Sequence, residues 1–167
     1  MQEGEPALEE DYVDLWNGGC NSPPTYPFQY LCGNGDHELT LCCNAGNYNY
    51  QGSEYRDTDW FIIYKASEPF AVTGEAEYPT YLFQLAFDPV QRCDGDVTVD
   101  QQILLDPCVP STLPLSGDIG DEVWVWGGCA GWENYPEFAY ILEFQGIEGA
   151  HTATQYTTWG AVKSMFR

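Results

Sequence analysis

Acidic residues of this chain gather at points where their oxygens could bind a metal ion. In the stretch RDTDWFIIY, Asp57 and Asp59 lie two residues apart, so they share one face of an extended backbone. Further acids precede Asn17, and the stretch CDGD supplies Asp94 and Asp96. Calcium takes six to eight oxygens from carboxylates, amides and backbone carbonyls, so we expect the protein to bind calcium. No EF-hand pattern is present, and each single acid could instead be a solvated loop residue.

Aromatic residues are the second group with a chemical use, because flat rings can stack on the C–H faces of sugars. In DEVWVWGG, Trp124 and Trp126 lie on one face of a strand, and Val123 and Val125 lie on the other. If the valines point inward, the two tryptophans form an exposed strip that suits a saccharide. If the tryptophans point inward they are ordinary core, which is the more frequent outcome. The other aromatic candidates for ligand binding are Tyr48, Tyr50 and Trp132.

Catalysis has little support in the sequence. No G-x-S-x-G nucleophile motif is present, and His37 and His151 are the only histidines. Paired carboxylates can hydrolyse glycosides, but a chain with 26 acids contains such pairs by chance. We therefore expect a protein that is not an enzyme.

The charge balance limits the possible partners. The 167 residues include 26 Asp and Glu but 5 Lys and Arg, which gives a net charge of -21. Such a chain repels nucleic acid and anionic membranes, so we expect neither as a partner. No apolar segment approaches the ~18 residues that a membrane span requires.

Seven cysteines are many for a cytosolic chain of this length, and they are not spaced as zinc ligands. We expect most of them to form disulfides in an oxidising, extracellular compartment. Cys93 and Cys108 flank a loop that a disulfide would close. Adjacent residues of a strand face opposite ways, so Cys42 and Cys43 should take different partners. The expected partner of Cys20 is one of Cys32, Cys42 or Cys43.

Short apolar runs between Gly, Pro and Asn turns indicate an all-β domain. We find no segment with convincing helical periodicity, and the pattern favours an antiparallel β-sandwich. Residues 44–52 read as a loop. The predicted strands cover residues 37–43, 59–65, 79–87, 97–105, 120–128 and 137–147.

The composition divides the chain into three parts. Residues 1–11 are acidic and predict a flexible segment, and residues 12–149 form the predicted sandwich. Residues 150–167 differ, because the stretch from 151 onward contains no acid and carries two of the basic residues. This tail could be a last strand, a docked segment or a sorting tag. Its end, TTWGAVKSMFR, resembles a short terminus of other secreted bacterial proteins, which would imply sorting or anchoring.

The segments YVDLWNGGCNSPP and YRDTDWFIIY together resemble a module of many secreted bacterial proteins. That module starts Y-V-D-x-x-N-G-G-C-N-S-x-P and contains an R-D-T-D-W-[YF] strand. It looks like the bacterial pre-peptidase C-terminal domain, a jelly-roll-like β-sandwich that is similar in turn to bacterial collagen-binding domains. The resemblance covers about residues 12–145.

The resemblance implies a non-catalytic accessory or adhesion module that binds a polysaccharide or a protein surface. It also implies calcium near the N-terminal segment, as in the collagen-binding relatives. The positions in the matching motifs, and thus the candidate calcium ligands, are Asp14, Asn17, Asp57 and Asp59. We expect a secreted, calcium-stabilised module that binds an extracellular polymer, with polysaccharide favoured. The alternative is a self-associating subunit of a filament or surface layer, in which the basic tail docks on an acidic neighbour.

Overall fold

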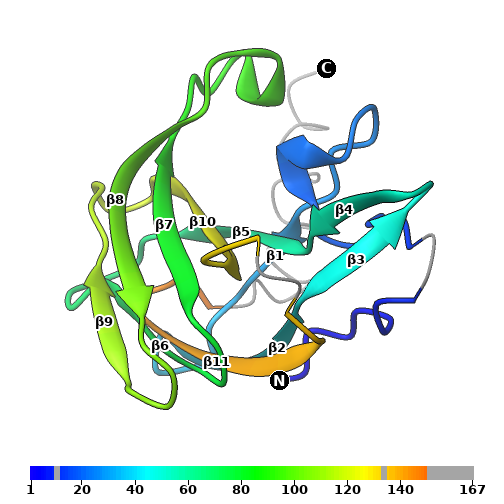
Figure 1. Ribbon diagram of the computed structural model, residues 1–167. Coiled ribbons are helices and arrows are strands. Elements are labelled where there is room, and N and C mark those ends of the chain that lie inside the picture. The colour runs from blue at the N-terminus through cyan, green and yellow to red at the C-terminus, as the bar shows by residue number, and fades with distance from the viewer. Residues whose placement is uncertain (10–11, 133–134, 150–167) are drawn as a thin grey trace.

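The computed structural model describes residues 1–9, 12–132 and 135–149, and their regular secondary structure is almost entirely β-strand (Figure 1). The predicted antiparallel β-sandwich is confirmed. One sheet has the strand order β1-β5-β10-β7-β8 and the other has the order β2-β11-β6-β9, while β3 and β4 form a separate hairpin. The strands are β1 (Gln29–Tyr30), β2 (Glu38–Ala45), β3 (Asn47–Tyr50), β4 (Ser53–Arg56), β5 (Thr58–Tyr64), β6 (Ala71–Ala76), β7 (Thr80–Ala86), β8 (Thr98–Leu105), β9 (Ser111–Pro114), β10 (Glu122–Cys129) and β11 (Phe138–Gln145).

The order of the strands is that of a jelly roll. Leaving out the short parallel strand β1, each sheet has four strands, and all their pairings are antiparallel. Counted along the chain, the first, eighth, third and sixth strands form one sheet, and the second, seventh, fourth and fifth form the other. Consecutive strands therefore alternate between the sheets except for β7 and β8, which pair in the same sheet, and this is the double Greek key of jelly rolls. The hairpin β3–β4 is inserted between the first two of these strands.

The core lies between the two sheets. Strand β11 alternates strictly, with Phe138, Tyr140, Leu142 and Phe144 buried and the residues between them exposed. The ring of Phe144 packs edge-on against Phe61 of the opposite sheet, with ring centroids 6.2 Å apart. Alternation of this kind is what a strand with one face in the core and one in water requires.

Strand β10 is buried on both faces, because loops cover the outer face of its sheet. Val123 and Val125 pack into the core between the sheets. Trp124 and Trp126 point outward but belong to a second apolar cluster, and they are 0% and 6% exposed. The ring of Phe87 stacks on Trp124, with centroids 3.8 Å apart. Of the two alternatives left open by the sequence, the exposed strip is therefore wrong, and Trp124 and Trp126 are not accessible as ligand-binding residues.

A single disulfide, Cys20–Cys93, closes the loops over this outer cluster. The predicted Cys93–Cys108 disulfide is wrong, because Cys93 bonds Cys20 and leaves Cys108 free and exposed. Cys43 does not pair with Cys20 either, since Cys43 lies in the core between the sheets while Cys20 packs against the outer cluster. The expectation that most cysteines are oxidised is also wrong. The free cysteines are Cys32, Cys42, Cys43, Cys108 and Cys129.

The region predicted as a loop at 44–52 is instead largely β-structure. It holds the end of β2 and all of β3, and β3 pairs with β4 so that Tyr48 lies opposite Tyr55. Figure 1 shows this hairpin extending away from the paired sheets. Strand β9 was also absent from the predicted set, because its four residues include Pro and show little apolar patterning.

The acidic N-terminal segment is held against the sandwich, contrary to the flexible segment that its composition predicts. Gln2 forms a parallel bridge with Cys42 of β2, and Glu3 is buried. The predicted tail, 150–167, lies outside the described residues. Within the part of the chain that the structure describes, no helix has the length and apolar character needed to cross a membrane.

Candidate metal centre

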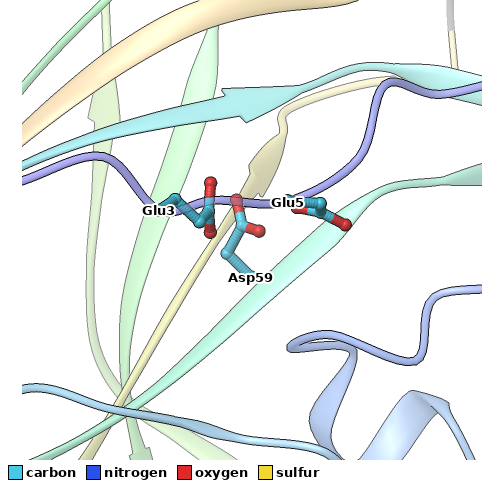
Figure 2. A group of neighbouring side chains, drawn as sticks. All are labelled: Glu3, Glu5 and Asp59. Atoms are coloured by element: carbon cyan, nitrogen blue, oxygen red, sulfur yellow. The ribbon is translucent and has the colours of Figure 1, made fainter.

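Five carboxylates from three segments of the chain meet beside the start of β5. Among the described residues, Glu3, Glu5 and Asp59 form one group, and Glu5, Asp14 and Asp57 form another. Within each group, one carboxylate oxygen from each residue lies within 4.8 Å of those of the other two. Figure 2 shows Asp59 reaching from β5 toward the N-terminal segment, which carries Glu3 and Glu5. We call these five residues the acid cluster.

The backbone at the start of β5 holds Asp57 and Asp59 deep in the protein. The N–H of Asp57 donates to the carbonyl of Gly46 at 2.9 Å, and Asp59 lies opposite Gly127 of β10. The hydroxyl of Tyr140 donates to Asp59. A Cβ at Gly127 would lie 2.8 Å from that hydroxyl oxygen, so glycine here leaves room for Tyr140 to reach the aspartate.

The loop with the sequence N-G-G-C-N-S folds over these aspartates. Asp14 accepts the N–H of Trp16 at 3.1 Å, which is an Asx turn, and it also accepts the N–H of Asn17 at 3.1 Å. The side-chain amide of Asn17 then donates to Asp59 at 2.7 Å and to Glu3. Gly18 passes so close to the cluster that a Cβ would lie 2.3 Å from an Asp14 oxygen. Contacts with the acid cluster thus hold the start of this loop, from Asp14 to Gly18, in place.

The remainder of the same loop packs on the D-T-D-W stretch. Gly19 has a φ of +49°, and a Cβ there would meet the Trp60 indole at 2.2 Å. The side-chain amide of Asn21 donates to the Thr58 hydroxyl at 3.0 Å. Cys20 between them forms the disulfide. The two motifs that were noted separately in the sequence are therefore two halves of one packed unit.

The N-terminal segment supplies the remaining carboxylates by pairing alongside β2. The N–H of Glu3 donates to the carbonyl of Cys42, and the N–H of Cys42 donates to the carbonyl of Met1, each at 2.9 Å. The N–H of Asn44 donates to a carboxylate oxygen of Glu3 at 3.2 Å. This pairing directs Glu3 and Glu5 to the cluster, because residues two apart in an extended segment share a face.

The oxygens of the acid cluster are unequally satisfied. Asp59 and Glu3 each accept hydrogen bonds at both carboxylate oxygens. In contrast, both oxygens of Asp57 are buried and accept no hydrogen bond of regular geometry, and the same holds for one oxygen of Glu5. The side-chain oxygen of Asn17 is buried without a donor as well. A buried acceptor without a donor costs about 1–3 kcal/mol, so these oxygens need a partner.

Burial and mutual repulsion disfavour the charged forms of these acids. Burial raises the pKa of Glu3 to about 7 and that of Glu5 to about 8. Burial, together with the charges of Glu5 and Asp14, raises the pKa of Asp57 well above its usual value, and the backbone N–H of Thr58 acts in the opposite direction. Without a cation, part of the cluster therefore holds protons at neutral pH. A bound cation would displace those protons.

The donor set fits a hard cation. Every ligand atom in the two groups is a carboxylate oxygen, and neither group contains His or Cys. Oxygen-only sites suit calcium or magnesium rather than zinc or copper. Calcium accommodates six or more oxygens in irregular geometry, whereas magnesium demands a regular octahedron and keeps several waters. The two groups of three carboxylates share Glu5, and an oxygen-rich, irregular arrangement of this kind is compatible with calcium.

The structure brings the four residues of the predicted metal site together: Asp14, Asn17, Asp57 and Asp59, all buried. Glu3 and Glu5 were missed, because the segment that carries them was expected to be flexible. A signal was present in the sequence, since Glu3 and Glu5 have the same two-residue spacing as Asp57 and Asp59.

Two of the predicted aromatic candidates lie next to the acid cluster. Tyr48 and Trp132 line a hollow of about 340 Å³, and Asp14 of the cluster lines it too. Tyr50 is not part of the lining but packs against Tyr55, which is, at 6.2 Å between ring centroids. The aromatic surface thus comes from the hairpin β3–β4 and the segment after β10.

Comparisons with known proteins give no relative for this chain. No protein-family model, no curated protein and no solved structure matches it. The resemblance to the pre-peptidase C-terminal domains therefore stays an expectation from the two motifs.

Proposed function

We propose that this protein is a secreted, non-catalytic binding module, stabilised by calcium, that attaches to an extracellular polymer. The observation that carries the proposal is the state of Asp57, a carboxylate that is 1% exposed and accepts no hydrogen bond of regular geometry on either oxygen. A protein that buries a carboxylate in this way without a cation sacrifices stability. Calcium converts this cost into a gain, because it provides the missing partner.

Calcium would join segments that the chain alone holds weakly. The N-terminal segment, the loop at 14–22 and the start of β5 each contribute carboxylates to the acid cluster. Their repulsion opposes the fold until a cation neutralises it. The excess of acids over the whole chain adds to this effect, and a calcium-rich extracellular medium would supply the ion. The single disulfide is compatible with that compartment.

The proposed ligand is an extracellular polymer, and polysaccharide is the favoured class. Exposed aromatic rings beside the centre support it, because Trp132 is 62% exposed and Tyr55 is 44% exposed. The alternative of a self-associating filament subunit depended on residues 150–167, which lie outside the described residues, so no contact of the described chain favours it.

Isothermal titration calorimetry with calcium chloride on the full chain tests the proposal. Extracellular modules bind calcium with a dissociation constant of about 0.1–1 mM, and we expect a value in this range. Asp57→Asn should weaken binding at least tenfold. The matched control is Glu143→Gln, which removes an exposed carboxylate of β11 outside the acid cluster and should leave the affinity unchanged. Calcium binding that is absent, or equal in all three proteins, would remove calcium from the proposal.

A further inference from the structure

The hollow beside the metal centre combines flat aromatic faces with polar edges. Its aromatic lining is Tyr48, Tyr55 and Trp132, and the rings of Tyr48 and Tyr55 stack 5.8 Å apart. Polar side chains complete the lining, among them those of Asn21 and Ser22. Its volume lies in the lower part of the range of small-molecule sites. Aromatic faces with hydroxyl and amide groups between them are what a sugar ring requires, since it has apolar faces and hydroxylated edges.

Arg56 gives this hollow an unusual charge. Three basic residues lie in the described chain, and two of them, Lys65 and Arg92, form ion pairs with carboxylates. Arg56 has no ion-pair partner among the described residues, although acids outnumber bases fivefold. Its guanidinium lies over the Trp132 ring at 4.2 Å and donates one hydrogen bond, to the carbonyl of Cys129. Its Nε is buried without an acceptor. Arg56 thus keeps hydrogen-bond donors for an anionic group.

The hollow and the metal centre share a wall. Asp14 belongs to the acid cluster and also lines the hollow. Gly18 lies between the two sides, since a Cβ there would be 2.3 Å from an Asp14 oxygen and 2.2 Å from the Ser22 hydroxyl. Without a cation, the charge of Asp14 and its neighbours repels an anion in the hollow. With a cation bound, that repulsion is offset.

We propose that this hollow is the subsite for an acidic saccharide, in which a ring stacks on the aromatic lining and a carboxylate bonds to Arg56. This rests on the proposed function, because the bound calcium makes the hollow accessible to an anion. A carboxylate on a protein segment would also pair with Arg56, but it would leave the stacked aromatic faces unused. An acidic saccharide would therefore use more of the residues that line the hollow than a protein carboxylate would.

The test is a binding screen with short oligosaccharides at saturating calcium. Each acidic probe is paired with its neutral counterpart, for example trimers of galacturonic acid and of galactose, and likewise for glucuronic and mannuronic acid. Isothermal titration calorimetry should detect at least one acidic trimer and show binding at least tenfold weaker for its neutral counterpart. Arg56→Gln should weaken the acidic trimer about tenfold or more, because a charge-assisted hydrogen bond is lost. Trp132→Ala should weaken it as well.

Two control variants have matched changes elsewhere. Arg92→Gln removes the same charge from a cation that is already paired, and Tyr30→Ala removes an exposed ring outside the hollow. Both should bind the acidic trimer as the unmodified protein does. If no acidic trimer binds, if Arg92→Gln weakens binding as much as Arg56→Gln, or if only acidic peptides bind, the inference is overturned.

Calcium titrations separate this inference from the proposed function. Arg56→Gln should keep the full calcium affinity while losing the saccharide, and Asp57→Asn should lose both. Saccharide binding that persists unchanged in EDTA would contradict the coupling through Asp14. Calcium binding without any saccharide binding would retain the metal centre and overturn the subsite.

Discussion

Two clusters flank the start of β5, and they are stabilised in opposite ways. The outer aromatic cluster, built around Trp60, Trp124 and Trp126, is apolar and is closed by the Cys20–Cys93 disulfide. The acid cluster is polar and charged, with buried oxygens that no hydrogen bond satisfies. The first cluster is complete within the polypeptide, whereas the second requires something from solution. The contribution of the outer aromatic cluster to stability is therefore fixed by the polypeptide, whereas that of the acid cluster depends on the solution.

The same short loop connects both clusters. Asn17 donates to the acid cluster, while Cys20, three residues later, is covalently bonded over the aromatic cluster. The disulfide anchors the loop even when the acids repel one another. We therefore expect the two clusters to respond independently to a reductant and to a chelator.

Loss of the disulfide should give the largest effect. Replacing Cys20 and Cys93 by Ser opens a crosslink that spans 73 residues of sequence, which corresponds to about 4 kcal/mol in the chain-entropy model. The free energy of unfolding, measured in urea, should fall by about this amount with and without calcium. A calcium increment that vanishes in the double variant would show that the two clusters are not independent.

Asp57→Asn should affect the acid cluster and leave the outer aromatic cluster unchanged. At a hundredfold excess of calcium over its dissociation constant, one site adds about 2.7 kcal/mol, or roughly 5–10 °C in melting temperature at this chain length. The variant should lose that increment. In EDTA it should melt no lower than the unmodified protein, because an amide in place of Asp57 removes repulsion. Sodium chloride at matched ionic strength controls for screening, and a lower melting temperature in EDTA would assign Asp57 a purely structural role.

The pH dependence should differ between the calcium-bound and calcium-free protein. The folded, calcium-free chain keeps protons on Glu3 and Glu5 up to a pKa of about 7 and about 8, whereas the usual value of 4.5 applies when it unfolds. Their contribution to stability is therefore fully present below about pH 4.5 and is lost as pH rises through 7 and 8. Each retained proton corresponds to about 1.4 kcal/mol per pH unit. The calcium increment in melting temperature should grow over this window, and an increment that is constant with pH would contradict the assignment.

The substitution Gly18→Ala should have the smallest effect of these changes. It should affect the acid cluster and not the disulfide. The φ of Gly18 is -64°, so alanine suits the backbone there, but its Cβ would overlap the side chains of Asp14 and Ser22 and force them to move. Overpacking of this kind costs about 1–3 kcal/mol. Gly18→Ala should weaken calcium binding in titration calorimetry while the disulfide still forms. Unchanged calcium affinity would show that Asp14 is not a ligand.

Sequence patterns determined the strands and, in part, the metal site. Alternating or continuous apolar runs located six of the strands, because burial on one or both faces dictates these periodicities. The grouping of Asp14 and Asn17 with Asp57 and Asp59 came from two motifs, and the structure packs the two motifs against each other. The sequence pattern indicates that these residues lie at the start of a buried strand and in a Gly-rich loop.

Tertiary structure alone decided three other features. Trp124 and Trp126 are buried because loops distant in sequence cover the outer face of their sheet, and alternation along β10 cannot reveal what lies beyond that face. Cys93 pairs with Cys20 because both reach that outer cluster, and spacing along the chain does not measure such proximity. Glu3 and Glu5 enter the site because their segment pairs with β2. An acidic segment looks solvated in isolation, since the partners that hold its carboxylates in the interior lie far away in the sequence.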